Sequence, residues 1–215
     1  MSRALGAKAL DLRTGVRIEV VTVAWMVVEA ALAIGSGVLA RSALLTAFGI
    51  DSLIELISGS VLLWRLVGEA RGSEPGRTEQ LERRAARISA LLLVLLCGYI
   101  IVTVTLGLIT RTQPEKSWVG IGVSLGAILV MPLLARSKRR IAERIGSPAL
   151  RADAAESITC AYMAGAVLAG VVLNAALGWW WAEYMAAPAL LFWLFGETRE
   201  AFEAARGGTQ DDDDD

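Results

Sequence analysis

The stretch FGIDSLIELISG, residues 48–59, places two carboxylates, Asp51 and Glu55, inside an otherwise apolar run. Residues four apart lie on the same face of a helix, so both side chains point to one side. A charged side chain at the middle of a bilayer costs about 2.5 to 3.5 kcal/mol on insertion scales, so an acid there indicates a functional site. Because two acids on one face repel each other, the stretch predicts a cation or proton between them.

The composition around this stretch is that of a membrane protein, since 55% of the 215 residues are hydrophobic and the mean hydropathy is +0.53. Long apolar runs that are almost free of charge predict membrane-spanning helices. We expect an all-α polytopic fold with six transmembrane helices at residues 17–38, 43–64, 88–110, 117–135, 149–177 and 179–195. Residues 1–16 would precede this transmembrane domain of residues 17–195, and residues 196–215 would form a short cytoplasmic helix with an acidic tail.

Basic residues lie in alternate connections between these helices. Of the 21 Lys and Arg residues, only Arg41, Arg111 and Lys116 follow the first or third helix. The others, including Lys138 in the predicted connection between the fourth and fifth helices, lie on the opposite side. By the positive-inside rule, both termini are predicted to face the cytoplasm, and we expect a multi-pass protein of a bacterial inner membrane.

A second pair with the same spacing occurs in LRADAAESITCAYMAGA, residues 150–166, where Glu156 and Cys160 are four apart. With Asp51 and Glu55 they supply three carboxylates and one thiol, enough for a four-coordinate divalent metal site shared by two helices. Structural roles remain as alternatives. Asp51 could cap a broken helix, Glu55 could pair with an arginine, and Cys160 could be a small apolar residue.

Other polar residues in the predicted spans are candidates for supporting roles. Asp153 lies near the cytoplasmic start of the fifth helix, where it could begin the helix or support the ligands. Glu29 and Glu183 could snorkel or line the ion pathway. Ser52, next to Asp51, is assigned to the same supporting or pathway group.

Four segments occur in an order that resembles the transmembrane region of the cation diffusion facilitators: ARSALLTAFGIDSLIE (40–55), GRTEQLE (76–82), ALRADAAESITC (149–160) and GWWWAEYMAAPAL (178–190). The resemblance implies a six-helix antiporter of divalent metal ions and protons, usually a homodimer, whose second and fifth helices hold the metal. Glu55, Glu156 and Cys160 stand where most members have Asp, His and Asp. No cytosolic metal-binding domain follows the sixth helix in this sequence, which is similar to a short branch containing transmembrane protein 163-like zinc transporters.

We therefore expect Zn²⁺ efflux in exchange for protons. Metal ions and protons compete for the same carboxylate and thiol lone pairs, and alternating access would convert this competition into antiport. Carboxylates suit Mn²⁺ or Fe²⁺, whereas a thiolate favours Zn²⁺, Cd²⁺ or Co²⁺, and Zn²⁺ is the preferred candidate. We expect no prosthetic group and no nucleic-acid partner. Enzymatic activity is not expected, because a chain without His has no Ser/His pair, and the lack of a phosphate-binding glycine motif disfavours ATP-driven transport.

Two other functions fit the same residues. In a proton-coupled exporter of small organic cations, Glu29 or Glu55 would alternately hold the substrate and a proton. Aromatic residues lining the first helix would favour that function, and Trp25 is the available one. A non-transporting metal sensor or scaffold would bind metal without any flux.

Overall fold

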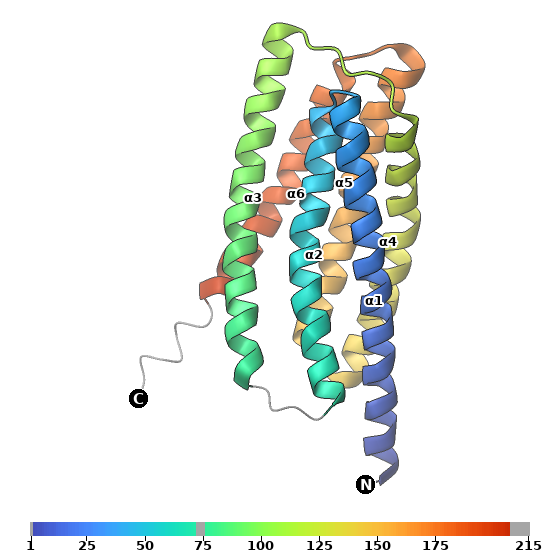
Figure 1. Cartoon of the computed structure of the whole chain (residues 1–215), viewed down its shortest axis with the longest axis vertical. Helices are drawn as coiled ribbons and strands as arrows, with labels where there is room; N and C mark the ends of the chain where they lie inside the picture. The colour runs from blue at the N-terminus through green and yellow to red at the C-terminus, as the bar shows by residue number, and fades with distance from the viewer. Residues whose placement is uncertain (1, 72–75, 207–215) are drawn as a thin grey trace.

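The structure is a bundle of six helices in which consecutive helices run in opposite directions (Figure 1). The computed structural model describes residues 2–71 and 76–206. The helices are α1 (Ser2–Leu39), α2 (Ala43–Ala70), α3 (Gly76–Thr110), α4 (Trp118–Ile145), α5 (Pro148–Leu177) and α6 (Ala182–Arg206). We call the end of the bundle where α1 begins the lower end, and the end that carries the α1–α2 connection the upper end.

Five helices contain stretches long and apolar enough to cross a membrane: Leu10–Leu39, Ala43–Ala70, Ala90–Thr110, Trp118–Ile145 and Ala149–Leu177. The predicted all-α polytopic membrane fold is therefore confirmed. α6 differs because its uncharged stretch, 184–196, lies between Glu183 and Glu197. At 1.5 Å per residue that stretch is about 20 Å long, shorter than a hydrocarbon core of about 30 Å. Both acids nevertheless lie within the bundle, Glu183 buried and Glu197 half-buried.

Serine and glycine residues define several helix ends. The hydroxyl groups of Ser42, Ser117 and Ser147 accept hydrogen bonds from backbone N–H groups in the first turns of α2, α4 and α5. These bonds satisfy N–H groups that have no partner inside the helix. α4 and α5 end at Gly146 and Gly178, whose φ angles of 70° and 67° favour glycine.

The helices extend beyond the predicted spans, mainly at the lower end. α4 continues to Ile145, so Lys138 lies inside a helix, and its assignment to a connection is wrong. α6 continues without a break to Arg206, so residues 196–206 prolong it. The predicted acidic tail lies outside the described residues.

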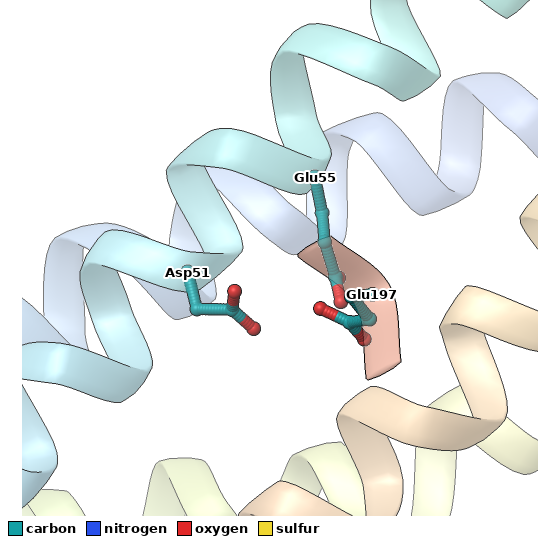
Figure 2. Close-up of side chains that lie close together, drawn as sticks. All are labelled: Asp51, Glu55 and Glu197. Carbon is teal, nitrogen blue, oxygen red and sulfur yellow. The ribbon is translucent and has the colours of Figure 1, made fainter. Parts of the chain in front are cut away.

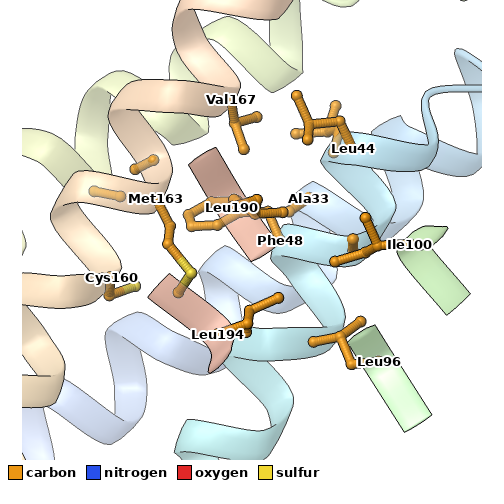
Figure 3. Packing of buried hydrophobic residues seen from close by; sticks show 14 of the residues in the cluster. Ala33, Leu44, Phe48, Leu96, Ile100, Cys160, Met163, Val167, Leu190 and Leu194 are labelled. Carbon is orange, nitrogen blue, oxygen red and sulfur yellow. The ribbon is translucent and has the colours of Figure 1, made fainter. Parts of the chain in front are cut away.

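Four helices, α1, α2, α4 and α5, pack closely together, and α3 and α6 pair with each other against α2 and α5. The main apolar core surrounds Phe48, Met163 and Leu190 (Figure 3). A smaller buried cluster closes the four-helix group at its lower end, and it contains Leu12, Leu62, Leu66, Ile141, Ala142 and Leu150.

Glycine lets α1 and α2 approach closely. A Cβ atom on Gly49 of α2 would lie 2.7 Å from the backbone nitrogen of Ile34 on α1, and one on Gly37 of α1 would lie 2.6 Å from that of Thr46. Such distances leave no room for a side chain, as is common where small residues bring membrane helices together. The close approach places polar residues of α1 beside those of α2.

Candidate metal site

Three carboxylates from two helices converge in the interior of the bundle. Asp51 and Glu55 project from α2, and Glu197 projects from α6 (Figure 2). One oxygen of each lies within 4.8 Å of one oxygen of both others. Asp51 is 1% exposed and Glu55 is 6% exposed, whereas Glu197 is half-buried. We call this group of three the carboxylate site.

The oxygens contributed by α2 have no hydrogen-bond partner in the described part of the chain. This holds for both oxygens of Asp51 and both oxygens of Glu55. Burying a carboxylate without a partner is costly, and nearly all buried polar groups in proteins are paired. Carboxylate oxygens are also ligands for divalent cations. A bound cation or bound protons would therefore remove the energetic penalty of this arrangement.

Glu29 of α1 forms a second polar group inside the bundle. Its side chain accepts hydrogen bonds from the indole Nε1 of Trp25, from Oγ of Ser52 at 2.8 Å and from Sγ of Cys160 at 3.5 Å. The Trp25 ring fits against Gly126 of α4, where a Cβ atom would lie 2.7 Å from the ring. α1, α2, α4 and α5 thus all contribute to holding Glu29.

The structure places three of the four predicted ligands in these two groups. Asp51 and Glu55 lie together, as their spacing predicts, and Glu197 is the third acid beside them. Cys160 is fully buried and contacts Glu29. Glu156 is half-buried and lies near enough to Asp51 and Glu55 to interact electrostatically with both.

Asp153 takes part in a different cluster, nearer the lower end. Its Oδ2 lies 2.5 Å from Nζ of Lys138, and that Nζ lies 3.2 Å from Oε2 of Glu19. The Lys138 ammonium also donates a hydrogen bond to Ser157 at 3.4 Å. This buried ion cluster joins α1, α4 and α5. The ion pair with Lys138 gives Asp153 a structural role in the cluster.

Glu183 connects several segments at the upper end. Its carboxylate accepts hydrogen bonds from the hydroxyl of Ser42 and from Nδ2 of Asn174, the latter at 3.1 Å. The same Asn174 amide donates to the backbone oxygen of Pro114 at 3.0 Å. Glu183 therefore ties the start of α6 to α2, α5 and the α3–α4 connection.

Three residues of these clusters were not identified from the sequence. Glu197 follows the predicted end of the sixth helix, and Lys138 was assigned to a connection. Glu19 lies near the start of the first predicted span and received no role. All three are charged residues within about one or two turns of the lower boundary of a predicted span. The helices continue past that boundary and still pack against one another there, so a charged residue at such a position can be buried.

The sequence matches the family model described as the cation efflux transmembrane domain over residues 20–205, a range that reaches all six helices. No curated protein matches the sequence. The match does not distinguish the short branch without a cytosolic domain from the rest of the family.

Proposed function

Because this chain belongs to the cation efflux family, whose members are metal-ion transporters, we propose that it exports Zn²⁺ in exchange for protons. The carboxylate site would hold the ion inside the bundle. The protein would act in a bacterial inner membrane, with both termini in the cytoplasm, and as a homodimer. It would need no prosthetic group, because the metal ion is the substrate.

The observation that carries this proposal is the convergence of Asp51, Glu55 and Glu197, with the four α2 oxygens unpaired and buried. Three negative charges within 4.8 Å of one another repel strongly in a medium of low dielectric constant. A divalent cation replaces this repulsion with attraction. Protons neutralise the same oxygens, so the two substrates exclude each other, and their competition supplies the coupling for antiport.

Donor chemistry supports the choice of Zn²⁺. Three carboxylates alone would suit Mn²⁺ or Fe²⁺, but a thiol lies in the same interior region. Cys160 contacts Glu29, which also accepts a hydrogen bond from Ser52, the residue next to Asp51. Access of the ion to sulfur favours Zn²⁺, Cd²⁺ or Co²⁺ over harder ions.

Transport in proteoliposomes tests the proposal. Vesicles containing the full chain should take up Zn²⁺ when a proton gradient is imposed, and the flux should stop when the gradient is collapsed. Asp51→Asn should reduce flux by on the order of tenfold or more, because losing even a group that only supports a metal ligand typically lowers metal affinity or activity by about 10 to 100-fold. Asp11→Asn is the matched control, because Asp11 lies 26% exposed in an ion pair with Arg144.

Each result separates the proposal from another function. Normal Zn²⁺ flux in Asp51→Asn would show that the carboxylate site does not carry the ion. Zn²⁺ binding without flux would indicate a sensor or scaffold. Proton-driven flux of ethidium in place of metal ions would indicate an exporter of organic cations. Cys160→Ala should lower the flux of Zn²⁺ and Cd²⁺ more than the flux of Mn²⁺, because the thiol favours the softer ions.

A further inference from the structure

The buried ion cluster contains more negative than positive charge. Glu19 of α1 and Asp153 of α5 face the single ammonium of Lys138 on α4, at 3.2 Å and 2.5 Å. The side chains of Glu19 and Lys138 are 0% exposed, and that of Asp153 is 8% exposed. When all three groups are ionised, one negative charge has no counter-charge within the cluster. Burying such a charge is costly, so the cluster favours binding one further proton.

The excess charge falls mainly on Glu19. Lys138 makes its shorter contact with Asp153 and also donates a hydrogen bond to Ser157. Oε2 of Glu19 faces the same ammonium at the longer distance, whereas Oε1 is buried without a hydrogen-bond partner in the described part of the chain. A proton on Oε1 would therefore neutralise the cluster and leave Oε2 beside the ammonium.

The surroundings of Oε1 offer it no second cation. Among the described residues, the titratable groups that face Glu19 are Lys138 from α4 and Asp153 from α5. α2 presents Gly59, where a Cβ atom would lie 3.1 Å from Oε1 of Glu19. The same Cβ atom would lie 4.0 Å from the sulfur of Met26. Oε1 thus borders a glycine and an apolar side chain, and a proton is the simplest source of the missing positive charge.

This carboxyl group lies about one helical turn from the carboxylate site. Gly59 follows Glu55 by four residues in α2, so the two positions share one face and are about 6 Å apart along the helix axis. α2 runs from the upper end to the lower end (Figure 1), which places Gly59, and the Glu19 carboxyl group beside it, on the lower side of Glu55.

The smaller apolar cluster lies between Glu19 and the lower end. Leu62 of this cluster follows Gly59 within one turn of α2. Leu150 of the same cluster precedes Asp153 within one turn of α5, which runs in the opposite direction. A proton on Glu19 would therefore be held between the carboxylate site and an apolar layer that closes the bundle.

We propose that Glu19 is a second proton-binding site, used by protons that pass between the carboxylate site and the lower end of the bundle. The proposal rests on the proposed antiport, and it adds a proton site that the metal ion does not occupy. The proton would bind an oxygen of Glu19 and pass to water when the apolar cluster opens, with no other bond made or broken. In the proposed orientation, the lower end is the side on which an exporter releases its protons.

Infrared difference spectroscopy of the purified full-length protein tests this assignment. Spectra at about pH 9 and about pH 6 avoid the range in which exposed carboxylates, with pKa values of about 4, take up protons. On acidification the parent should gain the carbonyl stretch of protonated carboxyl groups, and Glu19→Gln should gain less of it, by one group per chain. Glu143→Gln, which alters an exposed pair with Arg139, should match the parent. An equal gain in the parent and in Glu19→Gln overturns the inference.

The variant should remain folded, because Lys138 and Asp153 keep a balanced ion pair without the charge of Glu19. Its thermal midpoint should be no lower than that of the parent. Glu19→Asp is a second variant, which keeps a carboxyl group on a shorter side chain. Its carbonyl band should be shifted from the position of the parent band, and a band unchanged in position and intensity overturns the inference.

Transport measurements separate this inference from the function on which it rests. Absence of Zn²⁺ flux in parent proteoliposomes contradicts the proposed function, whereas the infrared result still decides whether Glu19 binds a proton. In Glu19→Gln, the flux driven by a proton gradient should fall while the Zn²⁺ affinity stays that of the parent, because the carboxylate site is intact. Zn²⁺ flux with the parent rate and the parent proton dependence contradicts the second proton-binding site alone.

Discussion

Replacing Lys138 tests the buried ion cluster. Its ammonium lies 3.2 Å from Glu19 and 2.5 Å from Asp153, and its side chain is 0% exposed. At an effective dielectric constant of about 20, these attractions come to about 5 and about 7 kcal/mol, and they oppose the cost of burying three charges. Lys138→Met preserves most of the side-chain volume but leaves two buried carboxylates without their cation. We expect a loss of about 3 to 5 kcal/mol in the free energy of unfolding.

Thermal unfolding of the full chain in detergent, followed by far-ultraviolet circular dichroism, measures this loss. At about 2 to 4 °C per kcal/mol for a chain of this size, the midpoint should fall by about 6 to 20 °C. Arg139→Met is the matched control in the same helix, because Arg139 and Glu143 are 74% and 58% exposed. Such surface pairs contribute little to stability. An equal fall in both variants would refute the reasoning.

A combined variant separates lost charge compensation from lost packing. Glu19→Gln, Lys138→Met and Asp153→Asn together leave no ionised group in the cluster. Removing one member of a buried ion cluster is costly because it leaves an uncompensated buried charge, and the Gln and Asn of the triple variant leave no such charge. The triple variant should therefore recover most of the midpoint lost by Lys138→Met. A triple variant as unstable as the single one would show that the packing of Lys138, and not its charge, matters.

Three further changes have defined outcomes. Glu197→Gln should lower metal flux about as much as Asp51→Asn, whereas Glu203→Gln, in an exposed pair with Arg199, should leave flux unchanged in the same proteoliposome assay. Gly49→Ala forces a Cβ against the α1 backbone and should lower the free energy of unfolding, measured by thermal unfolding, by about 1 to 3 kcal/mol. Gly35→Ala is the control and should not lower it, because a Cβ there meets no atom within 4 Å. Asn174→Ala leaves buried acceptors unpaired at the upper end and should cost about 1 to 3 kcal/mol by the same measurement.

The fold was predictable because the bilayer imposes length and polarity on each helix. Apolar runs gave six helices in the right places, and the upper helix ends agree with the structure within a few residues. The lower ends do not, because hydropathy reports only the part of a helix in contact with hydrocarbon. α4 continues through charged residues that face solvent or pair with neighbours, and Lys138 is buried there by packing against α1 and α5.

The site was predictable only where it depends on local spacing. Asp51 and Glu55 share one face because they are four apart in one helix, and that relation needs no tertiary information. The partners come from other helices. Glu197 joins them because α6 continues past its apolar stretch. Glu29 of α1 meets Ser52 of α2, which glycine brings close to α1, and also Cys160 of α5. Both depend on how helices cross, which spacing along a single helix does not determine.

A cation at the carboxylate site would connect two sets of helices. Asp51 and Glu55 belong to α2, whereas Glu197 belongs to α6, which packs mainly against α3 and α5 and has little direct contact with α2. Without a cation, ionised carboxylates repel across this sparsely packed boundary. A bound ion reverses the repulsion and so favours the arrangement in which α6 is held near α2. In the proposed exchange, protons would displace the ion from the same oxygens. Cation exchange at this site would then also change the free energy of bringing α2 and α6 together, as alternating access requires.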